Sequence, residues 1–458
     1  MKIAFVSYDQ YQGEAPGIYP PIHLVALATT LQNHNYEVRV FDYAESFKSI
    51  DSYFKKISDF GPHVIGITCY TRYISSFNDI TKKLRTFFPK AVMIAGGAHP
   101  SVWPEWTLEN MPHFDYALQG ECDNSILSFV EMLSGKISAE QVPGLVYRSN
   151  GSICKNKHDF IADLNILPII NREFLDIYYN SDMYWHLAAN GKLDVMVTSR
   201  GCPYTCSFCF KLENTYRFRS VEHVMEEFEY LASRGIKSIH IQDDAFTANK
   251  KRALEIAKQL IKGRFNFELK IRSRVNSVEK EILTLLKKAG VKQIIYGIES
   301  GSQKMLDSME KKTTVEMNRR AIALTKKAGI ACYADMMIGM PGETRETIDE
   351  TISFLKATRP IVGYIPVLYP LPRTKVYEDA KREGTLRGDW EVDGKMPWIE
   401  LPWANSKSDI EAESTRISKT TQRDLGTLLY FLRHCLIRFN KRKVKFLLNY
   451  ARNFLLTK

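Results

Sequence analysis

Residues 201–210 read Gly-Cys-Pro-Tyr-Thr-Cys-Ser-Phe-Cys-Phe and place Cys202, Cys206 and Cys209 in one short segment. The C-x3-C-x2-C spacing supplies three thiolates from a single loop, which is one ligand too few to close a structural tetrahedral zinc site. Thiolates are the usual ligands of iron–sulfur clusters, and a cubane held by three cysteines leaves one iron open to an exogenous ligand. The segment therefore predicts a [4Fe–4S] cluster with a free coordination site. The alternative is a trio of structural core cysteines.

The motif resembles that of radical S-adenosylmethionine (SAM) enzymes. In that family the open iron chelates the amino and carboxylate groups of SAM, and an aromatic residue before the third cysteine packs near the adenine. Phe208 holds that aromatic position here. The resemblance implies that the three cysteines are the metal ligands, and that SAM is a cofactor whose reductive cleavage supplies a 5′-deoxyadenosyl radical.

Size and charge limit the possible architectures and partners. At 458 residues the chain is too long for one ordinary core, so we expect two or three domains. The net charge is +11, with 63 Lys and Arg against 52 Asp and Glu, which favours anionic ligands or surfaces without specifying one. From Leu425 to Lys458 there are eight Lys or Arg residues and no acidic residue.

The cysteine usage and the apolar segments indicate a compartment. The five cysteines outside the motif show no C-x2-C pairing, so we expect a reducing cytoplasm and neither a disulfide framework nor a second cluster. Met1-Lys-Ile-Ala-Phe-Val opens directly as a strand, so no secretory leader is expected. No uncharged apolar stretch reaches about 18 residues, so no membrane-spanning helix is expected.

Residues 1–142 alternate short β-rich runs with amphipathic stretches, the pattern of βα units in a parallel sheet. A helical pattern over His23–His34 carries Leu24, Ala28 and Leu31 on one face. We expect five strands: Lys2–Ser7, Glu37–Tyr43, His63–Thr68, Ala91–Ala95 and Asp115–Gln119. They predict an α/β fold, here a doubly wound, Rossmann-like or flavodoxin-like domain with a ligand crevice at the strand carboxyl ends.

Residues 143–192 are irregular, and we expect a β-turn-β at Asn150-Gly151 followed by a linker. A second series of βα units spans residues 193–375. We expect strands at Asp194–Ser199, Ser238–Gln242, Glu268–Arg272, Gln293–Ile298, Ala331–Ile338 and Val362–Tyr369, and helices that include Val221–Ser233, Arg252–Lys262 and Thr344–Thr358. Six units do not close an eight-stranded barrel, so they predict an open partial (βα)6 barrel with the cysteine loop after its first strand.

This second half matches the radical SAM core at further positions. Asp244, after the second strand, resembles the acid that accepts a hydrogen bond from the SAM amino group, although Asp243 and Asp244 read alone would also fit a helix N-cap. Arg274, after the third strand, matches the cation for the SAM carboxylate. After the fourth strand, Glu299 matches the ligand of the ribose hydroxyls, and Ser300 matches a carboxylate or ribose ligand.

Two turns complete the resemblance to the core. Ile338-Gly-Met-Pro-Gly-Glu343 offers a backbone turn to the adenine edge. Tyr369-Pro-Leu-Pro-Arg-Thr374 resembles the family's Pro-x-Pro-Gly-Thr, with Arg373 in place of the glycine. That departure leaves the conformation of the local turn open.

The first domain resembles the cobalamin-binding domain that precedes this core in a large class of radical SAM enzymes. The matching stretches are Tyr19–Leu24, Gly66–Thr71, Gly96–Ser101 and Gly120-Glu121. The resemblance implies cobalamin as a third cofactor. The residues it assigns to cobalamin binding are Thr68, Tyr70, Thr71, Gly96, Gly97, His99, Gly120 and Glu121.

The chain departs from classical cobalamin domains in its histidines. It contains no Asp-x-His-x-x-Gly, so no protein histidine is assigned as the lower cobalt ligand. His23 and His99 lie on the matching loops, where we expect them to act as hydrogen-bonding or packing residues. A degenerate domain that binds no cobalamin is the alternative.

Residues 376–458 form a C-terminal extension. Its aromatic segment carries Trp390, Trp398 and Trp403, which either shape the substrate pocket or pack against the barrel. Its basic end repeats apolar residues at helical spacing, which predicts an amphipathic helix that caps the barrel. Peripheral contact with a membrane surface is the second interpretation, and binding to nucleic acid is not expected.

Together these features predict an oxygen-sensitive cytoplasmic enzyme with a [4Fe–4S] cluster, SAM and cobalamin. The expected reaction is methylation of an unactivated carbon or phosphorus centre in a small-molecule or lipid-like substrate, with an external electron donor of the flavodoxin or ferredoxin type. The enzymatic alternatives are radical cyclisation, rearrangement or C–C coupling. A non-catalytic SAM- or cobalamin-binding protein is the rival from another class.

Overall fold

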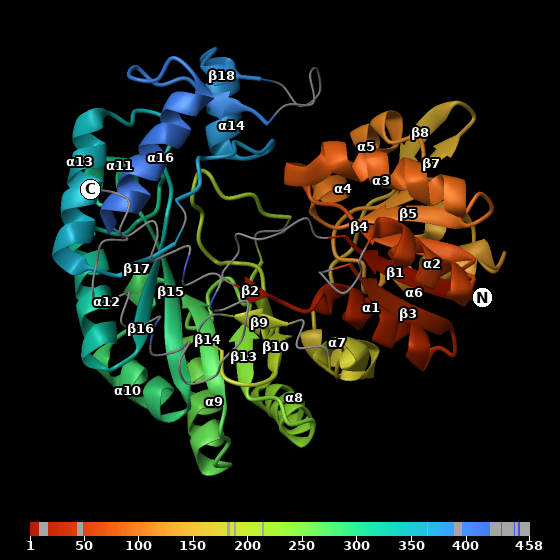
Figure 1. Cartoon of the computed structure of the whole chain (residues 1–458), viewed down its shortest axis with the longest axis horizontal. Helices are drawn as coiled ribbons and strands as arrows, with labels where there is room; N and C mark the ends of the chain where they lie inside the picture. The colour runs from red at the N-terminus through yellow and green to blue at the C-terminus, as the bar shows by residue number, and fades with distance from the viewer. Residues whose placement is uncertain are drawn as a thin grey trace. The chain divides into compact units, whose positions relative to one another are not determined.

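The computed structural model describes residues 1–8, 17–43, 49–180, 184–186, 189–212, 215–363, 365–388 and 396–421, together with residues 432, 444 and 448. The chain divides into two compact units, Met1–Tyr184 and Trp185–Lys458 (Figure 1). Trp390 and almost all of the basic segment from Leu425 onward lie outside the described residues.

The first unit contains a seven-stranded sheet with the order β3-β1-β4-β5-β6-β7-β8. Its strands are β1 (Lys2–Ser7), β3 (Glu37–Asp42), β4 (Val64–Thr68), β5 (Val92–Gly96), β6 (Tyr116–Leu118), β7 (Leu145–Ser149) and β8 (Ser152–Lys155). The strands from β3 to β6 pair in parallel, in the order of a flavodoxin-like sheet. The predicted doubly wound α/β domain is confirmed, and the five predicted strands differ from the observed ones by one residue at most at each end.

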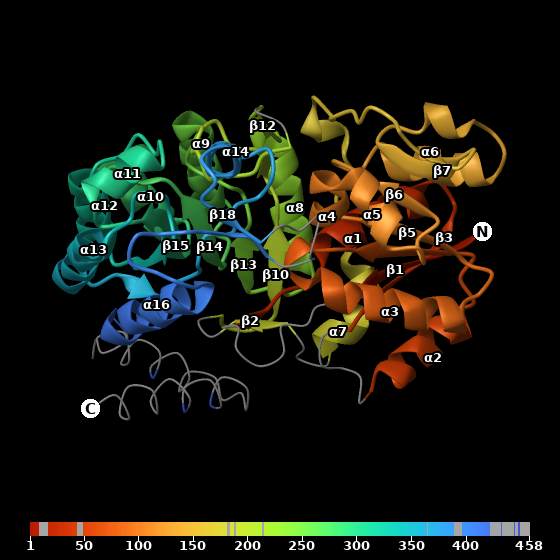
Figure 2. The same ribbon diagram turned by 90° about the horizontal axis from the view of Figure 1, so that it is seen from above.

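Several helices of this unit pack against one another in pairs. The helices of the unit are α1 (Ile22–Asn33), α2 (Ile50–Phe60), α3 (Ile74–Phe87), α4 (Ala98–Val102), α5 (Pro104–Asn110), α6 (Ser125–Leu133) and α7 (Asp176–Asn180). α1 packs beside α6, and α2 beside α3 (Figure 2). α2 shows how local sequence sets its bounds, because Ser49 caps its amino end in a capping box and Gly61, at φ 67°, ends it.

The β-turn-β predicted after residue 142 belongs to the first sheet. β7 pairs antiparallel with β6, and β8 pairs antiparallel with β7. The compact unit therefore extends past the position where the sequence analysis placed the end of the domain, since these two strands need the edge of β6 for their hydrogen bonds.

The second unit contains a six-stranded parallel sheet in simple sequence order, with β10 and β17 at its edges. The strands are β10 (Leu193–Met196), β13 (Ser238–Ile241), β14 (Glu268–Ser273), β15 (Val291–Glu299), β16 (Ala331–Met336) and β17 (Ile361–Val362). Helices α8 (Val221–Ser233), α9 (Lys250–Lys262), α10 (Lys280–Lys288), α12 (Val315–Lys327) and α13 (Arg345–Thr358) connect them and lie around the outside of the sheet (Figure 1). The predicted open partial barrel is confirmed.

Two predicted strands of this unit are wrong in extent. The first stops at Met196, and Ser199–Arg200 forms a separate strand, β11, which pairs with β12 (Arg217–Phe218). The sixth is only Ile361–Val362, because Pro366 has no N–H to donate to the ladder and leaves a single bridge between Ile338 and Val367.

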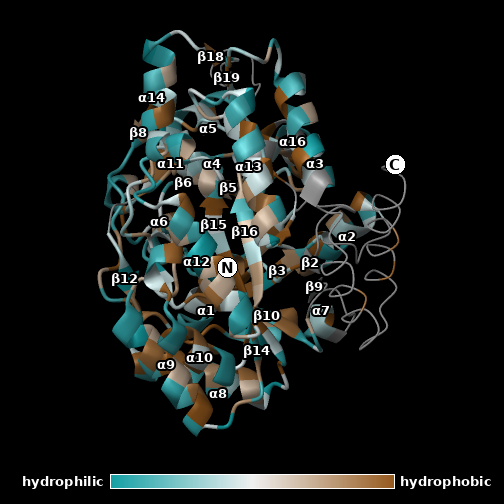
Figure 3. Cartoon of the chain, turned by 90° about the vertical axis from the view of Figure 1, so that its left-hand side faces the viewer, coloured by the Kyte–Doolittle hydropathy of each residue, from teal (hydrophilic) through white to brown (hydrophobic). Residues whose placement is uncertain are grey.

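The remaining elements cover the carboxyl end of the sheet and its flank. They are α11 (Gln303–Ser308), α14 (Lys375–Arg382), the pair β18 (Leu386–Arg387) and β19 (Trp398–Ile399), and α16 (Lys407–Thr421), with the short strands β2 (Gly17–Ile18) and β9 (Trp185–His186) elsewhere. Arg416 of α16 contacts Asp349 of α13 at 3.2 Å. The outer helices carry both hydrophilic and hydrophobic residues along their length (Figure 3). Among the described helices, none is both long enough and apolar enough to span a bilayer.

Candidate active site

The cysteine loop lies between β11 and β12, just beyond the carboxyl end of β10. Gly201 begins it at φ 78°, and a Cβ atom at this position would lie 2.1 Å from the carbonyl oxygen of Thr215. Only glycine therefore lets the two ends of the loop pass this closely. Within the loop, the Cys209 N–H donates to the Cys206 carbonyl at 3.2 Å, and the Lys211 ammonium donates to the Cys202 carbonyl at 2.9 Å.

Two distant segments hold the middle of this loop. The Ser207 N–H donates to the Met309 carbonyl at 3.0 Å, and the Val376 N–H donates to the Ser207 carbonyl at 3.1 Å. Phe208 is half-buried and packs against an apolar cluster that includes Met340 and Val376. Phe208, which we predicted to pack near the adenine, therefore lies against the same cluster as Met340 of the Gly-Met-Pro-Gly turn.

The three cysteines suit an iron–sulfur cluster. None of the three forms a disulfide, and the charge of Cys206 affects the ionisation of both Cys202 and Cys209. Burial raises the pKa of Cys202, and burial followed by the charges of Cys206 and Cys202 raises the pKa of Cys209 to about 11. Three thiolates in one loop would repel one another, and bound iron cations would offset that repulsion.

The donor set does not suit a single metal ion. No group of three His, Cys, Asp or Glu side chains in the described ranges is compact enough to hold one ion. A cubane binds each thiolate through a different iron, so its ligands are spaced more widely than those of one ion. The fit is therefore to a cluster.

Arg274 lies against the cysteine loop. Its guanidinium carbon is 3.9 Å from the ring centroid of Tyr204, and its Nη1 lies 3.7 Å from the Cys206 sulfur, to which it donates. The side chain is only 7% exposed, and its Nε lacks a hydrogen-bond partner among the described residues. The cation predicted for the SAM carboxylate is thus held beside one of the predicted cluster ligands.

Asp244 lies at the same end of the sheet. Loss of hydration beside the surrounding protein, and then the negative charge of Asp243, raise the pKa of Asp244. The positive charges of Arg272 and Lys211 oppose that rise. The carboxylate is exposed, in the same neighbourhood as Cys202 and Cys209, whose ionisation it affects. Neither Asp243 nor Asp244 caps a helix, because Asn249 is the N-cap of α9.

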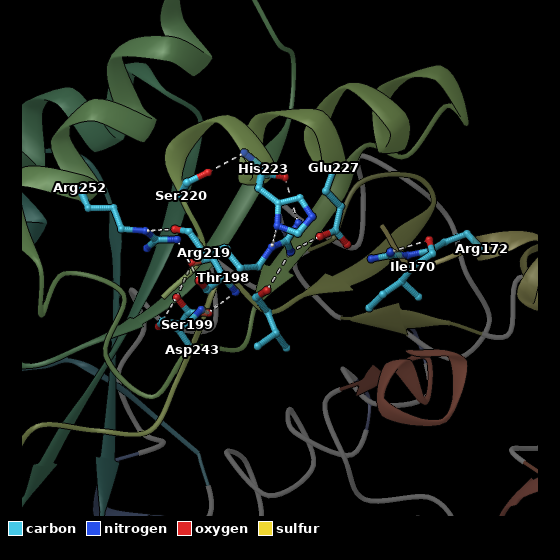
Figure 4. Close-up of polar contacts among 11 residues, drawn as sticks. Ile170, Arg172, Thr198, Ser199, Arg219, Ser220, His223, Glu227, Asp243 and Arg252 are labelled. Atoms are coloured by element: carbon cyan, nitrogen blue, oxygen red, sulfur yellow. Dashed lines mark hydrogen bonds and ion pairs between the residues drawn. The ribbon is translucent and has the colours of Figure 1, made fainter. Parts of the chain in front are cut away.

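Asp243 organises the strand that leads into the loop (Figure 4). Its fully buried carboxylate accepts four hydrogen bonds, from the N–H groups of Thr198 and Ser199 at 2.6 and 3.0 Å and from their hydroxyls at 2.5 and 2.7 Å. Arg252 donates to the carbonyls of Thr198 and Arg219 at 2.9 and 2.8 Å. The backbone just before the cysteines is therefore fixed by a side chain from the loop after β13 and by one from α9.

Arg219 extends this network. It donates to the Val197 carbonyl at 3.1 Å and forms a buried ion pair with Glu227 of α8. The sequence analysis missed Thr198, Arg219, Glu227 and Arg252. Their pattern alone gives no signal, because charged residues near helix ends usually face solvent.

Glu299 is paired with a cation that the sequence analysis also missed. Its Oε1 lies 3.1 Å from the Lys311 ammonium, and both side chains are largely buried. Glu299 adopts φ 64°, at the register shift where β15 meets β16. A non-glycine residue in this region stores strain, which is typical of functional sites.

Ser300 and the adenine turn are engaged within the protein. The Ser300 hydroxyl lies 3.0 Å from the Thr351 hydroxyl and accepts from the Ser302 N–H at 3.1 Å. The Gly339 N–H donates to the Glu343 carboxylate at 2.6 Å, and burial raises the pKa of Glu343 to about 7. Ser300 and Gly339 are therefore hydrogen-bonded to other groups of the protein.

Arg373 adopts the conformation of the glycine that it replaces. Its φ is 66°, and its N–H donates to Glu378 at 3.2 Å. Its guanidinium carbon lies 5.6 Å from the ring centroid of Phe210 in the cysteine loop. The turn left open by the sequence is therefore left-handed, as a glycine would make it.

In the first unit, the predicted cobalamin residues gather at the carboxyl ends of β4 and β5. Gly97, at φ 93°, leaves no room for a Cβ, which would lie 2.9 Å from Thr68 Cγ2. Thr68 Oγ1 lies 3.0 Å from Nε2 of His23, and Thr71 Oγ1 lies 3.3 Å from Nδ1 of His99.

His99 is a packing residue. It is 1% exposed, burial lowers its pKa to about 3, and its ring packs edge-on against Trp106 at 5.3 Å. Gly120, at φ 82°, donates its N–H to the Ser101 hydroxyl at 3.0 Å, which links the β6 loop to the β5 loop. Tyr70 is exposed, Gly96 ends β5, and Glu121 follows Gly120 in the loop after β6.

Comparison with known proteins assigns both units. Residues 196–355 match the Radical SAM superfamily, and residues 11–129 match the B12 binding domain. An uncharacterized methyltransferase, PH0819 of Pyrococcus horikoshii, is 29% identical over 79% of this chain and 78% of its own length. The anaerobic magnesium-protoporphyrin IX monomethyl ester cyclase of Cereibacter sphaeroides is 27% identical over 83% of this chain and 64% of its own length.

A solved structure shows the same arrangement of folds. The radical SAM methyltransferase TsrM from Kitasatospora setae, solved with cobalamin and a [4Fe–4S] cluster bound, has a TM-score of 0.75 and 18% identity, covering 92% of this chain and 88% of TsrM. At 18% identity, this similarity shows that the two chains share a fold and nothing more. Taken with the cysteine loop and the two domain matches, it leads to one conclusion: the chain belongs to the radical SAM enzymes that carry an N-terminal cobalamin-binding domain.

Proposed function

We propose that this enzyme methylates an unactivated carbon or phosphorus centre of a small molecule, using a [4Fe–4S] cluster, SAM and cobalamin. The observation that carries the proposal is the presence, in one chain, of a three-thiol loop at the carboxyl end of a partial barrel and a flavodoxin-like unit that matches the B12 binding domain. When bound, the cluster supplies the electron that cleaves SAM to a 5′-deoxyadenosyl radical, and cobalamin carries the methyl group of a second SAM.

The residues of the second unit bind and orient SAM. Cys202, Cys206 and Cys209 hold the cluster. Arg274, beside Cys206, neutralises the SAM carboxylate, and Asp244 accepts from the SAM ammonium. With the carboxylate held by Arg274 and the ammonium held by Asp244, these two side chains would fix the orientation of bound SAM.

Other residues define the rest of the SAM site. Glu299, held by Lys311, receives the ribose hydroxyls, and Phe208 packs near the adenine. Ser300 acts through Thr351 and Ser302 rather than by direct contact.

In the first unit we assign cobalamin to the loops that follow β4, β5 and β6. The residues are Thr68, Tyr70, Thr71, Gly96, Gly97, His99, Gly120 and Glu121. The burial of His99 against Trp106 supports a site in which no protein histidine ligates cobalt. His99 then supports the loop, and the backbone at Gly96-Gly97 allows close approach of the cofactor.

We place the enzyme in a reducing cytoplasm, with an external electron donor of the flavodoxin or ferredoxin type, and we expect oxygen sensitivity. None of the seven cysteines that the structure describes forms a disulfide, and this supports the reducing compartment. The family's chemistry supports the donor, because each reductive cleavage of SAM consumes one electron.

The test is the stoichiometry of the two products of SAM. The reconstituted holoenzyme is incubated without oxygen with a chemical reductant, trideuteromethyl-SAM and a polar small-molecule extract, and products are read by mass spectrometry. Methylation predicts S-adenosylhomocysteine and 5′-deoxyadenosine in equal amounts, with the label in one extract compound. 5′-Deoxyadenosine alone, with a consumed but unlabelled compound, would reject methylation and favour the cyclisation performed by the Cereibacter relative.

A further inference from the structure

The two segments that hold the middle of the cysteine loop each carry an exposed cation. The Ser207 N–H donates to the Met309 carbonyl at 3.0 Å, and the Ser207 carbonyl accepts from the Val376 N–H at 3.1 Å. Lys312 lies three residues after Met309 and is exposed. Arg373 lies three residues before Val376 and is also exposed. Because three residues span at most about 10 Å, both cations are attached to backbone close to the cysteine loop.

Both cations occupy a backbone conformation that suits glycine better. Lys312 has φ 54° and Arg373 has φ 66°, both in the left-handed region. Arg373 replaces the glycine of the Pro-x-Pro-Gly-Thr motif that its turn resembles. A side chain in this region strains the backbone, and such strain is found mostly at functional sites. Since glycine would fit both turns without strain, the conformation favours a role for the two side chains themselves.

Neither charge is balanced by an ion pair within the described part of the chain. The Lys312 side chain makes no hydrogen bond there, and its acidic neighbour Glu310 is paired with Lys375 at 3.3 Å. Beside Arg373, the Glu378 carboxylate accepts the backbone N–H at 3.2 Å and forms no ion pair with the guanidinium. The two cations are therefore available to an anionic partner.

Arg373 lies beside the most exposed part of the cysteine loop. Its guanidinium carbon is 5.6 Å from the ring centroid of Phe210. Phe210 directly follows Cys209, which is exposed, whereas Cys202 and Cys206 are half-buried. A partner that rests on Arg373 would therefore lie beside the most exposed of the three predicted cluster ligands. This position suits electron transfer, because the rate of electron transfer between proteins falls steeply with distance.

An acidic protein fits these two cations better than a small anion does. Exposed charges hold small ions weakly, because water and salt compete with each contact. The same charges can steer and orient a large partner of opposite charge. Transient electron-transfer interfaces are small and depend on such complementarity. The proposed reaction also requires an electron from outside the chain for each SAM that is cleaved.

We propose that Lys312 and Arg373 are docking residues for an acidic electron-transfer protein, which approaches the cluster from the side of Cys209. The donor loses one electron for each SAM cleaved, and the cluster receives it. The inference rests on the proposed function, because it names the partner that serves the same site. Neither cation contacts SAM or the cluster in this arrangement, so a small-molecule reductant should bypass both.

Binding of purified acidic donors tests docking without turnover. The full-length reconstituted enzyme is titrated at low salt with an oxidised flavodoxin and with an oxidised ferredoxin, and binding is measured by biolayer interferometry. Lys312→Gly and Arg373→Gly should each raise the dissociation constant about three- to fivefold, as expected for exposed ion pairs. The double variant should raise it about tenfold or more. At about 1 M salt the variants and wild type should bind equally weakly, because the Debye length falls to about 3 Å.

Arg264→Gly is the matched control. Arg264 is also an exposed cation, with φ 51°, but it lies between α9 and β14 at the amino end of the sheet, away from the cysteine loop. This variant should bind the donors like wild type. Glycine relieves the strained turn in all three single variants, so neither melting temperature nor iron content should fall. A lower iron content in Arg373→Gly would assign Arg373 to support of Phe210 and would contradict docking.

Formation of 5′-deoxyadenosine separates docking from chemistry. With Ti(III) citrate as the reductant, Lys312→Gly and Arg373→Gly should cleave SAM at the wild-type rate. With flavodoxin kept reduced by its reductase, the same variants should need more flavodoxin to reach half of the maximal rate. If donor binding responds as expected but neither reductant supports SAM cleavage, the proposed function fails and the docking surface stands.

Three results would overturn the proposal. The first is that wild type binds neither donor, and the second is that both glycine variants bind the donors like wild type. The third is that the rate with Ti(III) citrate falls as far as the rate with flavodoxin, which would show that the cations act on the cluster or on SAM. Loss of binding to anionic vesicles or to nucleic acid, with donor binding unchanged, would belong to the second result and would assign the surface to that other partner.

Discussion

At the scale of single residues, two adjacent aspartates have different roles: Asp243 is a buried hydrogen-bond acceptor, and Asp244 is the proposed ligand of the SAM ammonium. In the loop after β13, Asp243 is buried and accepts four hydrogen bonds, whereas Asp244 is exposed and affects the ionisation of Cys202 and Cys209. The spacing of the motif pointed to Asp244, while nothing in the sequence distinguished Asp243 as the acceptor for Thr198 and Ser199. That role depends on hydrogen bonds between residues more than 40 positions apart in the chain, and a local sequence pattern cannot predict such contacts.

The pair gives a matched prediction. Asp243→Asn replaces an acceptor-only group by an amide whose NH2 faces donors, so at least one buried N–H or hydroxyl loses its partner, at a cost of about 1–3 kcal/mol. We expect a lower melting temperature and a reduced iron content after reconstitution. Asp244→Asn should keep both and weaken SAM binding about tenfold, measured by equilibrium dialysis. Equal behaviour of the two variants would contradict the division.

Glu343 predicts a dependence of stability on pH. Its pKa is raised to about 7 in the folded protein, above the unfolded value, so the folded state binds more protons between the two values. The stabilisation is present below the unfolded pKa and is lost as pH rises through about 7, with an upper limit of about 3 kcal/mol. Glu343→Gln keeps the acceptor for Gly339 but cannot titrate. Wild type should lose melting temperature relative to this variant between pH 5 and pH 8, values chosen to bracket most of the transition. A constant difference would refute the assignment.

At the scale of elements, the sequence predicted most strands but misjudged two. Alternating or continuous apolar residues were sufficient to predict the strands β1, β13 and β14, because the burial of these strands follows directly from that pattern. Residues 362–369 read as one apolar strand, but Pro366 leaves only Ile361–Val362 in the ladder. The first barrel strand is divided into β10 and β11 where Thr198 and Ser199 donate hydrogen bonds to Asp243. These contacts are tertiary, so the local sequence does not predict the division.

The glycine at the start of the cysteine loop allows a prediction at this scale. Gly201→Ala places a Cβ against the Thr215 carbonyl and forces β11 and β12 apart. We expect loss of the broad cluster absorbance and of SAM cleavage. Gly384→Ala is the control, because Gly384 has a similar φ of 72° and no heavy atom within 4 Å of the added Cβ. It should cost only the local strain of about 1 kcal/mol and retain the cluster. A cluster retained in Gly201→Ala would show that the loop ends can separate freely.

At the scale of the whole molecule, the sequence predicted the two units and their order. It did not predict how far the first unit extends, since β7 and β8 are recognisable as part of its sheet only once β6 offers an edge. In the site, it named the residues that follow strand ends and missed their partners Lys311, Arg252 and Arg219. Arg252 lies on α9, whereas Lys311 and Arg219 lie in loops that precede α12 and α8, and in both settings a buried cation and an exposed one look alike in sequence.

The basic segment from residue 425 onward, outside the described residues, gives a prediction for the intact chain. If it caps the barrel, truncation after Asp424 should lower the melting temperature and leave liposome binding unchanged. If wild type sediments with vesicles containing anionic lipid in a salt-sensitive manner and the truncated chain does not, the segment is a membrane contact. Sedimentation with matched neutral vesicles is the control.

The hydrogen bond from the Val376 N–H to the Ser207 carbonyl has a consequence for synthesis of the chain. The strands of the second unit pair in sequence order, so each can join the sheet as it leaves the ribosome. The cysteines emerge with the first of these strands, whereas the backbone that closes their loop emerges after the last. A nascent chain released before α14 would carry Cys202, Cys206 and Cys209 and every strand of the barrel and still lack a closed loop. We therefore expect stable binding of iron to wait until Val376 has left the ribosome, rather than to follow the appearance of the thiols.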